Sequence, residues 1–456
     1  MSSYFNHVDH ASLLRDFPLG DEFLSRFRSL SRDELRARQE EQFKSAVARA
    51  WKTGFYRRLW GEQGIEPGDI RGLDDLTKLP VFDKADLMAA IEQHPPYGDF
   101  AGADPDTRVI LHTTSGTTGR PQTLLFGPRS REIQNLLLAR VYRFQGLTDD
   151  DIVHSVYGFG MINGGHYVRE ALLHWTNALM LPAGTGAETR SAQQVALMRD
   201  FGVTAIVGFA DFIRRLADVA REQGIEPGRD IPVRMISGHI GREDRDALSA
   251  AWGGAAVYDW YGVGDTGIIA AEGPDRDGLY VMEDAHVLEL LDIDSGAPVA
   301  EGESGDMVAT VLFKDDVYPI IRFNTHDVSA VKPGRSALDL NLRRLQGFLG
   351  RSDNMVKLRG INVFPQAIGP MLAGLDGFAG EYVCRVKRDE QGRDDMTVHV
   401  EVAGAPDKVV YEAALRQALG VGAAIEFARP GELAPLTEVE TRQKPKRLID
   451  DRFEGA

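Results

Sequence analysis

The chain has 456 residues and a formal net charge of −16, with 43% hydrophobic and 26% charged residues. This composition is typical of a globular protein with two or three domains. The negative charge argues against nucleic-acid binding, because proteins of that class normally present a basic surface. The single cysteine, Cys384, excludes an internal disulfide and a cysteine-rich zinc site.

The sequence also argues against a membrane partner. No apolar run approaches the ~18 residues that a membrane-spanning helix needs. Residues 1–20 contain His and Asp and lack the sustained apolar core of a secretion signal. We therefore expect a cytoplasmic protein.

Two helices are predicted near the N-terminus. Apolar residues recur at helical spacing from Leu35 to Trp51, which predicts a helix over residues 31–60 with Ser31 as a cap. A second helix is predicted from Asp83 to residue 91. Between residues 110 and 256, short apolar strands alternate with helices, which is the signature of an α/β fold with a largely parallel sheet. The clearest strands there are 152–156, 178–181 and 204–207, and the clearest helices are 165–177, 192–201 and 212–223.

After residue 278 the pattern becomes rich in strands, and the last hundred residues have strands and a helix of their own. Strands are predicted at 279–281, 286–291, 306–312, 318–322, 382–386 and 396–402, and a helix at 407–419. We therefore predict an α/β protein whose large N-terminal domain, residues 1–350, has mixed sheets flanked by helices and a β-rich subdomain at about 278–350. A small α+β domain, residues 351–456, follows.

A glycine-rich run, Thr113-Thr-Ser-Gly-Thr-Thr-Gly-Arg-Pro121, lies between the β-prone segments 108–112 and 123–126. Such a loop wraps its backbone N–H groups around an anion, and its glycines allow the close approach that a phosphate needs. Side-chain donors in the run are Thr114, Ser115, Thr117, Thr118 and Arg120. The run therefore predicts a nucleotide triphosphate site, although it is not a Walker loop. A flexible surface loop is the alternative interpretation.

Four further polar segments stand at the ends of predicted strands: residues 257–265, 320–327, 349–365 and 444–448. Each alone has an ordinary explanation as a turn or a solvated tail. In this order and with this spacing they resemble the adenylate-forming superfamily of acyl-CoA synthetases, peptide-synthetase adenylation domains and luciferases. The chain is most similar to the phenylacetate–CoA ligase family, and the similarity extends over nearly its whole length. Further matching segments are 55–58, 79–84, 157–160, 282–284 and 319–322.

The resemblance implies a two-step reaction. A carboxylate attacks the α-phosphate of ATP in the presence of Mg2+, which gives an acyl-adenylate and pyrophosphate. A thiol, most often that of coenzyme A, then displaces AMP. The C-terminal domain is expected to rotate between the steps about the hinge residue Asp353, and a homodimer is possible by the same resemblance.

The resemblance also implies roles for individual residues. The loop Thr114–Gly119, which includes Gly116, would hold the β- and γ-phosphates of ATP. Asp327 would bind the ribose hydroxyls, and Arg351 would lie near the ribose and phosphate. Further ATP contacts are expected from Asp259, Trp260 and Tyr261. The catalytic lysine is expected to be Lys444, which stands three residues before Arg447 and would neutralise charge in the transition state. Lys446 is the alternative. It stays open because Gln443 stands before Lys444 where the family usually has a glycine, and because Pro445 follows.

The sequence departs from the family pattern at Gly264 and Asp265, where Ser or Thr followed by Glu is common. Asp265 can still ligate Mg2+ with a shorter reach, so it is predicted as the metal ligand and as a catalytic residue. Thr266 would supply the missing hydroxyl if the turn is shifted. Other departures are Arg120 in place of a lysine, and Asn324 and His326 where basic residues are frequent. These departures indicate a specialised branch or a reduced catalyst.

The acid is expected to bind in the middle of the large domain, with Asp259 and Trp260 among the residues that line the pocket. The other candidate lining residues are Tyr157, Phe159, Gly208, Phe209, Gly238 and His239. This mixture of aromatic residues and glycines suits a flat aromatic acid, and His239 and Asp259 could read a hydroxyl or amino substituent. The alternative is that Phe159 and Phe209 only fill the core.

Three functions remain open from the sequence. The first is adenylation of an aromatic acid with coenzyme A as the acceptor. The second keeps the adenylation but uses a carrier-protein thiol or an amine as the acceptor, or a small oxyanion such as nitrite in place of the acid. The third is a non-catalytic nucleotide-binding protein, which the presence of Asp327, Arg351, Asp353 and Lys444 argues against.

Overall fold

The computed structural model describes residues 4–101, 110–114, 121–240, 244–314, 317–358, 361–388, 394–419, 421–439 and 445–453. The chain forms two compact units. The large unit comprises Met1–Thr325 and Ser329–Gly347, and the small unit comprises His326–Val328 and Phe348–Ala456. Among the described residues, no helix combines the length and the apolarity needed to cross a membrane.

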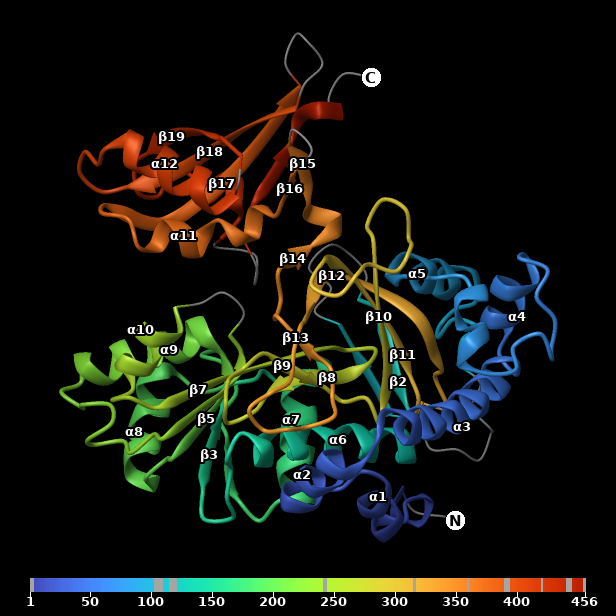
Figure 1. Ribbon diagram of the computed structural model, residues 1–456. Helices are drawn as coiled ribbons and strands as arrows, with labels where there is room; N and C mark the ends of the chain where they lie inside the picture. Colours follow the sequence, from blue (N-terminus) through green and yellow to red (C-terminus); the bar gives the residue numbers. More distant parts are fainter. Residues whose placement is uncertain are drawn as a thin grey trace. The chain divides into compact units, whose positions relative to one another are not determined.

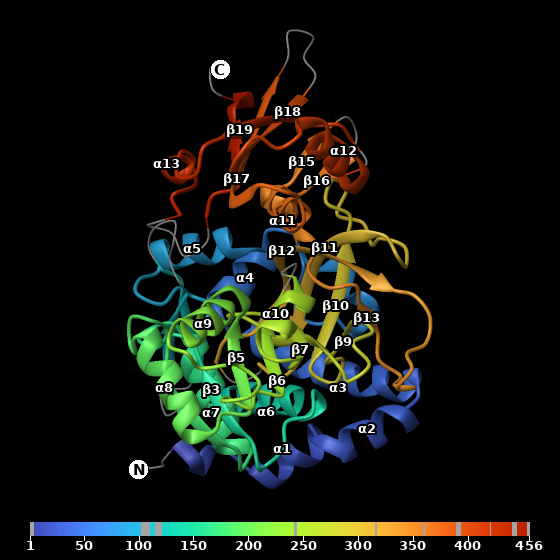
Figure 2. The same cartoon turned by 90° about the vertical axis from the view of Figure 1, so that its left-hand side faces the viewer.

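The large unit contains five parallel strands in the order β4-β3-β5-β6-β7 (Figures 1 and 2). These strands are β3 (Ile152–Ser155), β4 (Leu179–Pro182), β5 (Ala205–Phe209), β6 (Met235–His239) and β7 (Ala256–Val263). Helices α7 (Asn163–Trp175), α8 (Ser191–Phe201), α9 (Ala210–Glu222) and α10 (Arg245–Ala251) connect them in turn. Because the strands are parallel, the residues that follow them meet at one edge of the sheet.

The strand-rich segment after β7 continues the same sheet with antiparallel strands, in the order β10-β11-β12-β13-β9-β8-β7. Its members are β8 (Gly267–Glu272), β9 (Leu279–Val281), β10 (His286–Leu291), β11 (Ser304–Val311), β12 (Ile320–Lys332) and β13 (Arg344–Leu345). The predicted strand 318–322 is thus the start of a longer strand, whose residues His326–Val328 belong to the small unit.

Helices cover both faces of the parallel strands. Side chains of α8, α9 and α10 pack with Ile206 and Ile236 on one face. Side chains of α6 (Pro128–Phe144) and α7 pack with Ala205 and Val207 on the other. Adjacent residues of β5 therefore point into opposite cores, which explains the continuous apolar character of this strand.

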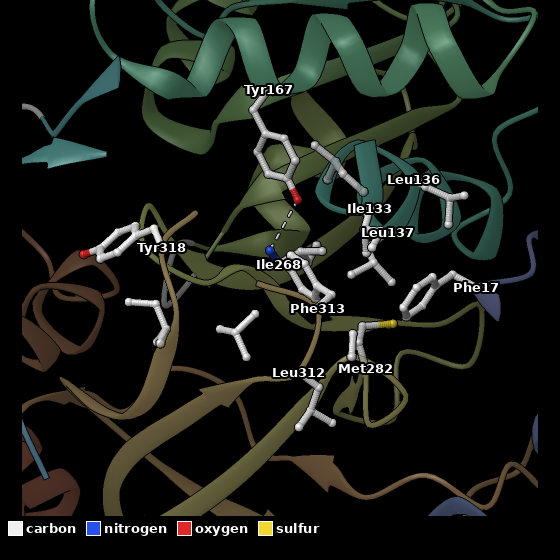
Figure 3. Packing of buried hydrophobic residues seen from close by; sticks show 14 of the residues in the cluster. Phe17, Ile133, Leu136, Leu137, Tyr167, Ile268, Met282, Leu312, Phe313 and Tyr318 are labelled. Atoms are coloured by element: carbon white, nitrogen blue, oxygen red, sulfur yellow. Dashed lines mark hydrogen bonds between the residues drawn. The ribbon is translucent and has the colours of Figure 1, made fainter. Parts of the chain in front are cut away.

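Helix α6 is buried along almost its whole surface, with only Arg129 and Arg143 partly exposed. Figure 3 shows its residues Ile133, Leu136 and Leu137 among apolar side chains from other segments. In the same view the hydroxyl of Tyr167 accepts a hydrogen bond from the backbone N–H of Ile268 at 3.3 Å. The helix follows the hairpin of β1 (Ile110–Thr113) and β2 (Thr123–Phe126), so it anchors that hairpin to the core.

The N-terminal region consists of helices α1 (His10–Asp16), α2 (Gly20–Ser29), α3 (Arg32–Ala50), α4 (Gly54–Gly61) and α5 (Lys84–Gln93). Ser31 forms a capping box with Glu34, and Asp83 caps α5, as the sequence predicts. The single helix predicted over residues 31–60 is wrong, because the chain turns at 51–53 and Thr53 starts α4 as a new N-cap.

The small unit has a four-stranded sheet in the order β19-β18-β17-β20. Its strands are β17 (Phe378–Arg388), β18 (Asp394–Val402), β19 (Ala424–Ala428) and β20 (Leu448–Asp450), and its helices are α11 (Gly369–Ala373), α12 (Lys408–Leu419) and α13 (Ala434–Thr437). Cys384 is buried in its core among valines of β17 and β18. Strand β14 (Gly350–Arg351) pairs with β12, and β15 (Val356–Leu358) pairs with β16 (Ile361–Val363).

A buried carboxylate ties the N-terminal segment to the core of the large unit. Glu132 of α6 accepts hydrogen bonds from the Tyr4 hydroxyl at 2.7 Å, from His174 Nδ1 at 3.0 Å and from Trp175 Nε1 at 3.0 Å. Burial acts to raise the pKa of Glu132, but the bonds from His174, Tyr4 and Trp175 outweigh it and hold that pKa below its usual range. The hydrogen bond to Glu132 in turn raises the pKa of His174 above its usual value.

This pair predicts a pH-dependent stability. Because the pKa of His174 is raised on folding, its contribution is complete below about pH 6.5, the unfolded value, and is lost as the pH rises through the folded value. Replacing His174 with Asn should therefore lower the melting temperature more at about pH 6 than at about pH 9. Thermal unfolding at both pH values checks this, with His7→Asn at an exposed position as the control. An equal loss at both pH values would contradict the charge-dependent role.

Candidate active site

The two ends of the glycine-rich run are held together by the backbone of Thr114 and Gln122. The N–H of Thr114 donates to the carbonyl of Gln122 at 3.0 Å, and the N–H of Gln122 donates to Thr114 Oγ1 at 3.2 Å. The predicted strand–loop–strand frame is present as β1 and β2. Residues Ser115, Gly116, Thr117, Thr118, Gly119 and Arg120 lie outside the described residues, so their phosphate contacts stay predictions.

Two buried cations lie beside the hairpin. Arg131 of α6 and Lys314, which follows β11, are 0% and 1% exposed. Their charged groups lie 5.1 Å and 4.8 Å from the ring centre of Phe126, the last residue of β2. Burial, together with the charges of Arg131 and His166, lowers the pKa of His112 in β1 to about 4. Two cations thus pack against the end of the hairpin, and Arg131 is also paired with Glu170 at 2.5 Å.

The turn after β7 buries the carboxylate of Asp265, which is 4% exposed. Its Oδ1 accepts hydrogen bonds from Gln122 Nε2 at 2.6 Å and from the Tyr318 hydroxyl at 2.8 Å. Burial raises the pKa of Asp265, and the charge of Lys314 opposes that rise. Burial also raises the pKa of Tyr318 well above its usual value, so its hydroxyl stays a donor at physiological pH.

The residues that flank Asp265 are packed closely in the turn. A side chain at position 264 would place its Cβ 2.8 Å from Leu124 Cδ1, so the Leu124 side chain would have to shift to admit it. The Thr266 hydroxyl donates to the carbonyl of Gly267 at 2.9 Å and is taken up in the turn.

Asp265 meets the predicted magnesium role with one oxygen only, and the charge of Lys314 acts on the same carboxylate. Both described hydrogen bonds to Asp265 end on Oδ1, which leaves Oδ2 for a hard cation. No group of three or more His, Cys, Asp or Glu residues that could hold a metal occurs in the part of the chain that the structure describes. Mg2+ is usually held by one or two carboxylates together with substrate phosphates, so one carboxylate is sufficient.

Four of the predicted pocket residues form one aromatic cluster after the parallel strands. The ring of His239 at the end of β6 lies 4.1 Å from that of Trp260 and is stacked on Phe209 with centroids 5.6 Å apart. Tyr157 lies 5.1 Å from Phe209 and 6.3 Å from Trp260. Phe209 is 38% exposed, whereas Tyr157 and Trp260 are buried, so the cluster opens to solvent at Phe209. We name Tyr157, Phe209, His239 and Trp260 the aromatic cluster.

Other candidate residues take different positions. Phe159 packs edge-to-face on His166 at 5.4 Å, outside the aromatic cluster. Tyr261 points to the opposite core from Trp260 and donates its hydroxyl to Thr325 at 3.1 Å. Asp259 accepts the backbone N–H of Ile240 at 2.9 Å and thereby fixes the end of β6.

The two candidate glycines are required by close packing in the sheet. A Cβ at Gly238 would lie 1.7 Å from the carbonyl oxygen of Gly208, its neighbour in the adjacent strand. A Cβ at Gly208 would lie 2.0 Å from Val156 Cγ2. Both positions therefore exclude a side chain, and their backbones bring Phe209 and His239 side by side.

In the small unit, Arg351 joins the predicted ribose ligand to the predicted hinge. Its Nη1 donates to Asp327 Oδ1 at 3.0 Å, and its Nε and Nη2 donate to the two oxygens of Asp353 at 2.9 and 2.7 Å. Asp327 is 6% exposed and pairs with Arg351 across β12 and β14. The three residues that sequence reasoning selected separately thus form one ion-pair network.

The segment that follows the candidate lysine is firmly anchored. Arg447 forms a bidentate pair with Glu381 at 2.8 and 3.0 Å and lies 4.4 Å from the ring centre of Tyr382. Lys446 is exposed, and its backbone N–H donates to Thr437 at 2.8 Å. Lys444 lies outside the described residues, so the choice between the two lysines stays a prediction.

Comparison with known proteins identifies the family. A family model described as AMP-binding enzyme matches residues 63–310, and one described as AMP-binding enzyme C-terminal domain matches residues 360–452. The phenylacetate-coenzyme A ligase of Pseudomonas putida is 31% identical over 382 residues, covering 81% of this chain and 82% of that protein. The enzyme of the same name from Aromatoleum evansii is 29% identical over 442 residues, covering 92% and 96%. The chain belongs to the family of AMP-binding enzymes, with phenylacetate-coenzyme A ligases among its relatives.

Solved structures support the fold. 2-Hydroxyisobutyryl-CoA ligase in the postadenylation state, in complex with 2-HIB-AMP, matches with a TM-score of 0.79 at 25% identity, covering 99% of this chain and 95% of that one. ATP-bound MatB from Rhodopseudomonas palustris matches with a TM-score of 0.52 at 17% identity, covering 70% and 63%, and shows the fold alone. The predicted fold class and the resemblance to adenylate-forming enzymes are confirmed.

Sequence reasoning missed Gln122, Lys314 and Tyr318 around Asp265. Lys314 had one sequence signal, because a single lysine ends the apolar run from residue 307. Gln122 and Tyr318 carry no local signal, since each acts through a residue distant in sequence.

Proposed function

We propose that this chain is an AMP-forming acid–thiol ligase. It activates an aromatic carboxylic acid with ATP, releases pyrophosphate, and transfers the acyl group from the acyl-adenylate to coenzyme A. The observation that carries this proposal is the similarity to phenylacetate-coenzyme A ligases over most of the chain. A related ligase was solved in complex with its acyl-AMP and coenzyme A, which supports the same order of steps.

The aromatic cluster supports an aromatic acid as the substrate. Its rings offer flat apolar surfaces for stacking, and Phe209 at its exposed side is where a ligand enters. His239 is the polar member of the cluster and selects for a hydrogen-bonding substituent on the acid. Asp259 contributes by fixing the end of β6 next to His239.

Three groups are assigned to the nucleotide. The run Thr114–Gly119 holds the triphosphate, and Asp327 accepts hydrogen bonds from the ribose hydroxyls. Arg351 orients the Asp327 carboxylate through their direct bond. Asp265 holds a magnesium ion through Oδ2, and that ion supplies positive charge to the phosphates.

The small unit is assigned the mobile role. Residues 351–456 rotate about Asp353 between the two steps, and Lys444 reaches the α-phosphate in the first step. The acceptor is coenzyme A. The departure from the family pattern at Gly264 and Asp265 keeps two alternatives open. The acceptor would then be a carrier-protein thiol or an amine, or a small oxyanion such as nitrite would replace the acid. A cytoplasmic location and a homodimer are part of the same proposal.

Exchange of labelled pyrophosphate into ATP tests the first step without assuming an acceptor. We expect acid-dependent exchange with one or more members of a panel of benzoates, phenylacetates and their hydroxy and amino derivatives. Addition of coenzyme A should then give a thioester that mass spectrometry detects. Exchange with no aromatic acid would contradict the proposed substrate class, and adenylation without a thioester would favour the alternative acceptors.

Substitution of each lysine tests the assignment of the catalytic cation. Lys444→Ala should lower the rate of exchange by about 100-fold or more, because charge developing at the α-phosphate loses its partner. Lys446→Ala is the matched control and should change the rate by less than about twofold. The reverse pattern would assign the role to Lys446.

A change at His239 tests the pocket. His239→Ala removes the ring between Phe209 and Trp260 and so enlarges the pocket. The ratio of kcat/KM for a larger aromatic acid to kcat/KM for a small one should therefore rise about tenfold. Steady-state kinetics over the same panel measure the ratio. His94→Ala at an exposed position serves as the control, and an unchanged ratio would place the acid elsewhere.

A further inference from the structure

The side chain of Gln122 links the base of the glycine-rich run to the turn that carries Asp265. Gln122 is 0% exposed, and its Nε2 donates to Asp265 Oδ1 at 2.6 Å. The Tyr318 hydroxyl donates to the same oxygen at 2.8 Å, so loss of the amide would remove one of the two described hydrogen bonds that hold it. Gln122 therefore contributes more than packing to the position of Asp265.

The backbone of the same residue closes the run. Its carbonyl accepts the N–H of Thr114 at 3.0 Å, and its own N–H donates to Thr114 Oγ1 at 3.2 Å. One residue thus holds both ends of the run by its main chain and Asp265 by its side chain. Asp265 and the two ends of the run are therefore connected through a single residue.

A second contact joins the same two segments. Leu124 of β2 stands two residues after Gln122. It occupies the space beside Gly264, where an added Cβ would lie 2.8 Å from Leu124 Cδ1. The two unusual residues of the turn, Gly264 and Asp265, therefore lie against Leu124 and Gln122 respectively.

The length of the side chains fits this arrangement. Asp265 is one methylene shorter than the glutamate common in the family, and the long amide of Gln122 spans the space between β2 and the turn. Tyr318 restrains the same oxygen from a third segment at 2.8 Å. The carboxylate is held from two sides, with its second oxygen left for the cation.

We propose that Gln122 is a positioning residue for the triphosphate of ATP, acting through Asp265 and through the closed ends of the glycine-rich run. This inference rests on the proposed function. It assigns to Gln122 no contact with the reacting atoms. Its role is to hold the phosphate-binding run and Asp265, the proposed magnesium ligand, at a fixed distance from each other.

Gln122→Met tests the inference, because methionine keeps the length of the side chain and removes the amide. We expect the Kd for ATP with Mg2+, measured by calorimetry without any acid, to rise about tenfold. In pyrophosphate exchange, KM for ATP should rise likewise, while KM for the acid stays within about twofold. Gln194→Met is the matched control, since Gln194 is also 0% exposed and donates to Gly184, Thr185 and Thr189, remote from the run.

A double variant tests the route of the effect. If Gln122 acts through Asp265, adding Gln122→Met to the Asp265→Asn variant should raise the Kd for ATP by no more than about twofold. If the double variant instead raises the Kd by the product of the two single effects, the coupling is overturned. Unchanged ATP affinity in Gln122→Met, with a fall in melting temperature like that of Gln194→Met, would leave only a structural role and overturn the inference. Failure of the unaltered protein to bind ATP would instead contradict the proposed function itself.

Discussion

The buried carboxylate of Asp265 is the constraint that fixes the geometry of the large unit around its candidate nucleotide site. A carboxyl group removed from water needs hydrogen bonds, and its charged form also needs nearby positive charge. The chain supplies these from separate segments: Gln122 just before β2, Tyr318 just before β12, and the ammonium of Lys314. Because these segments are distant in sequence, the carboxylate brings the hairpin, the β7–β8 turn and the end of β11 to one place.

The second constraint is the parallel arrangement of β3, β5, β6 and β7. Each strand delivers one aromatic or polar residue just after or at its carboxyl end, and the neighbouring strands bring these residues together. Glycines at Gly208 and Gly238 are needed so that adjacent strands approach closely at this point. The aromatic cluster is therefore a consequence of the sheet, and the exposed Phe209 marks its open side. In the small unit, Arg351 binds both Asp327 and Asp353 and so joins the predicted ribose ligand to the predicted hinge.

Local signals in the sequence predicted much of this organisation. Alternation of apolar strands and helices predicted the parallel sheet, and the caps Ser31 and Asp83 were recognised because capping chemistry is local. Helix α6 was not predicted, although Ile133, Leu136 and Leu137 have helical spacing, and nothing in the local sequence shows that it is buried on nearly all sides. The helix predicted over residues 31–60 ran through the turn at Thr53, since apolar spacing alone does not register a new cap.

The pocket residues were predicted only in part, because strand pattern is a local signal and side-chain direction in irregular segments is not. The strand pattern brings the aromatic cluster together. Tyr157 follows β3, Phe209 and His239 end β5 and β6, and Trp260 lies within β7 just after its parallel pairing with β6. Phe159 lies beyond the strand on an irregular segment, and its direction toward His166 could not be read from spacing. Gln122 and Lys314 were missed because their importance comes from pairing with Asp265, a long-range contact that a single sequence does not encode locally.

The central claim is that the triphosphate of ATP lies in the bend between Thr114 and Gln122, beside Asp265. A crystal structure with a non-hydrolysable ATP analogue and Mg2+ measures this directly. It should place the β- and γ-phosphates against the backbone of residues 115–119, with the ion bound to Asp265. A nucleotide bound elsewhere, with that bend facing only solvent, would contradict the claim.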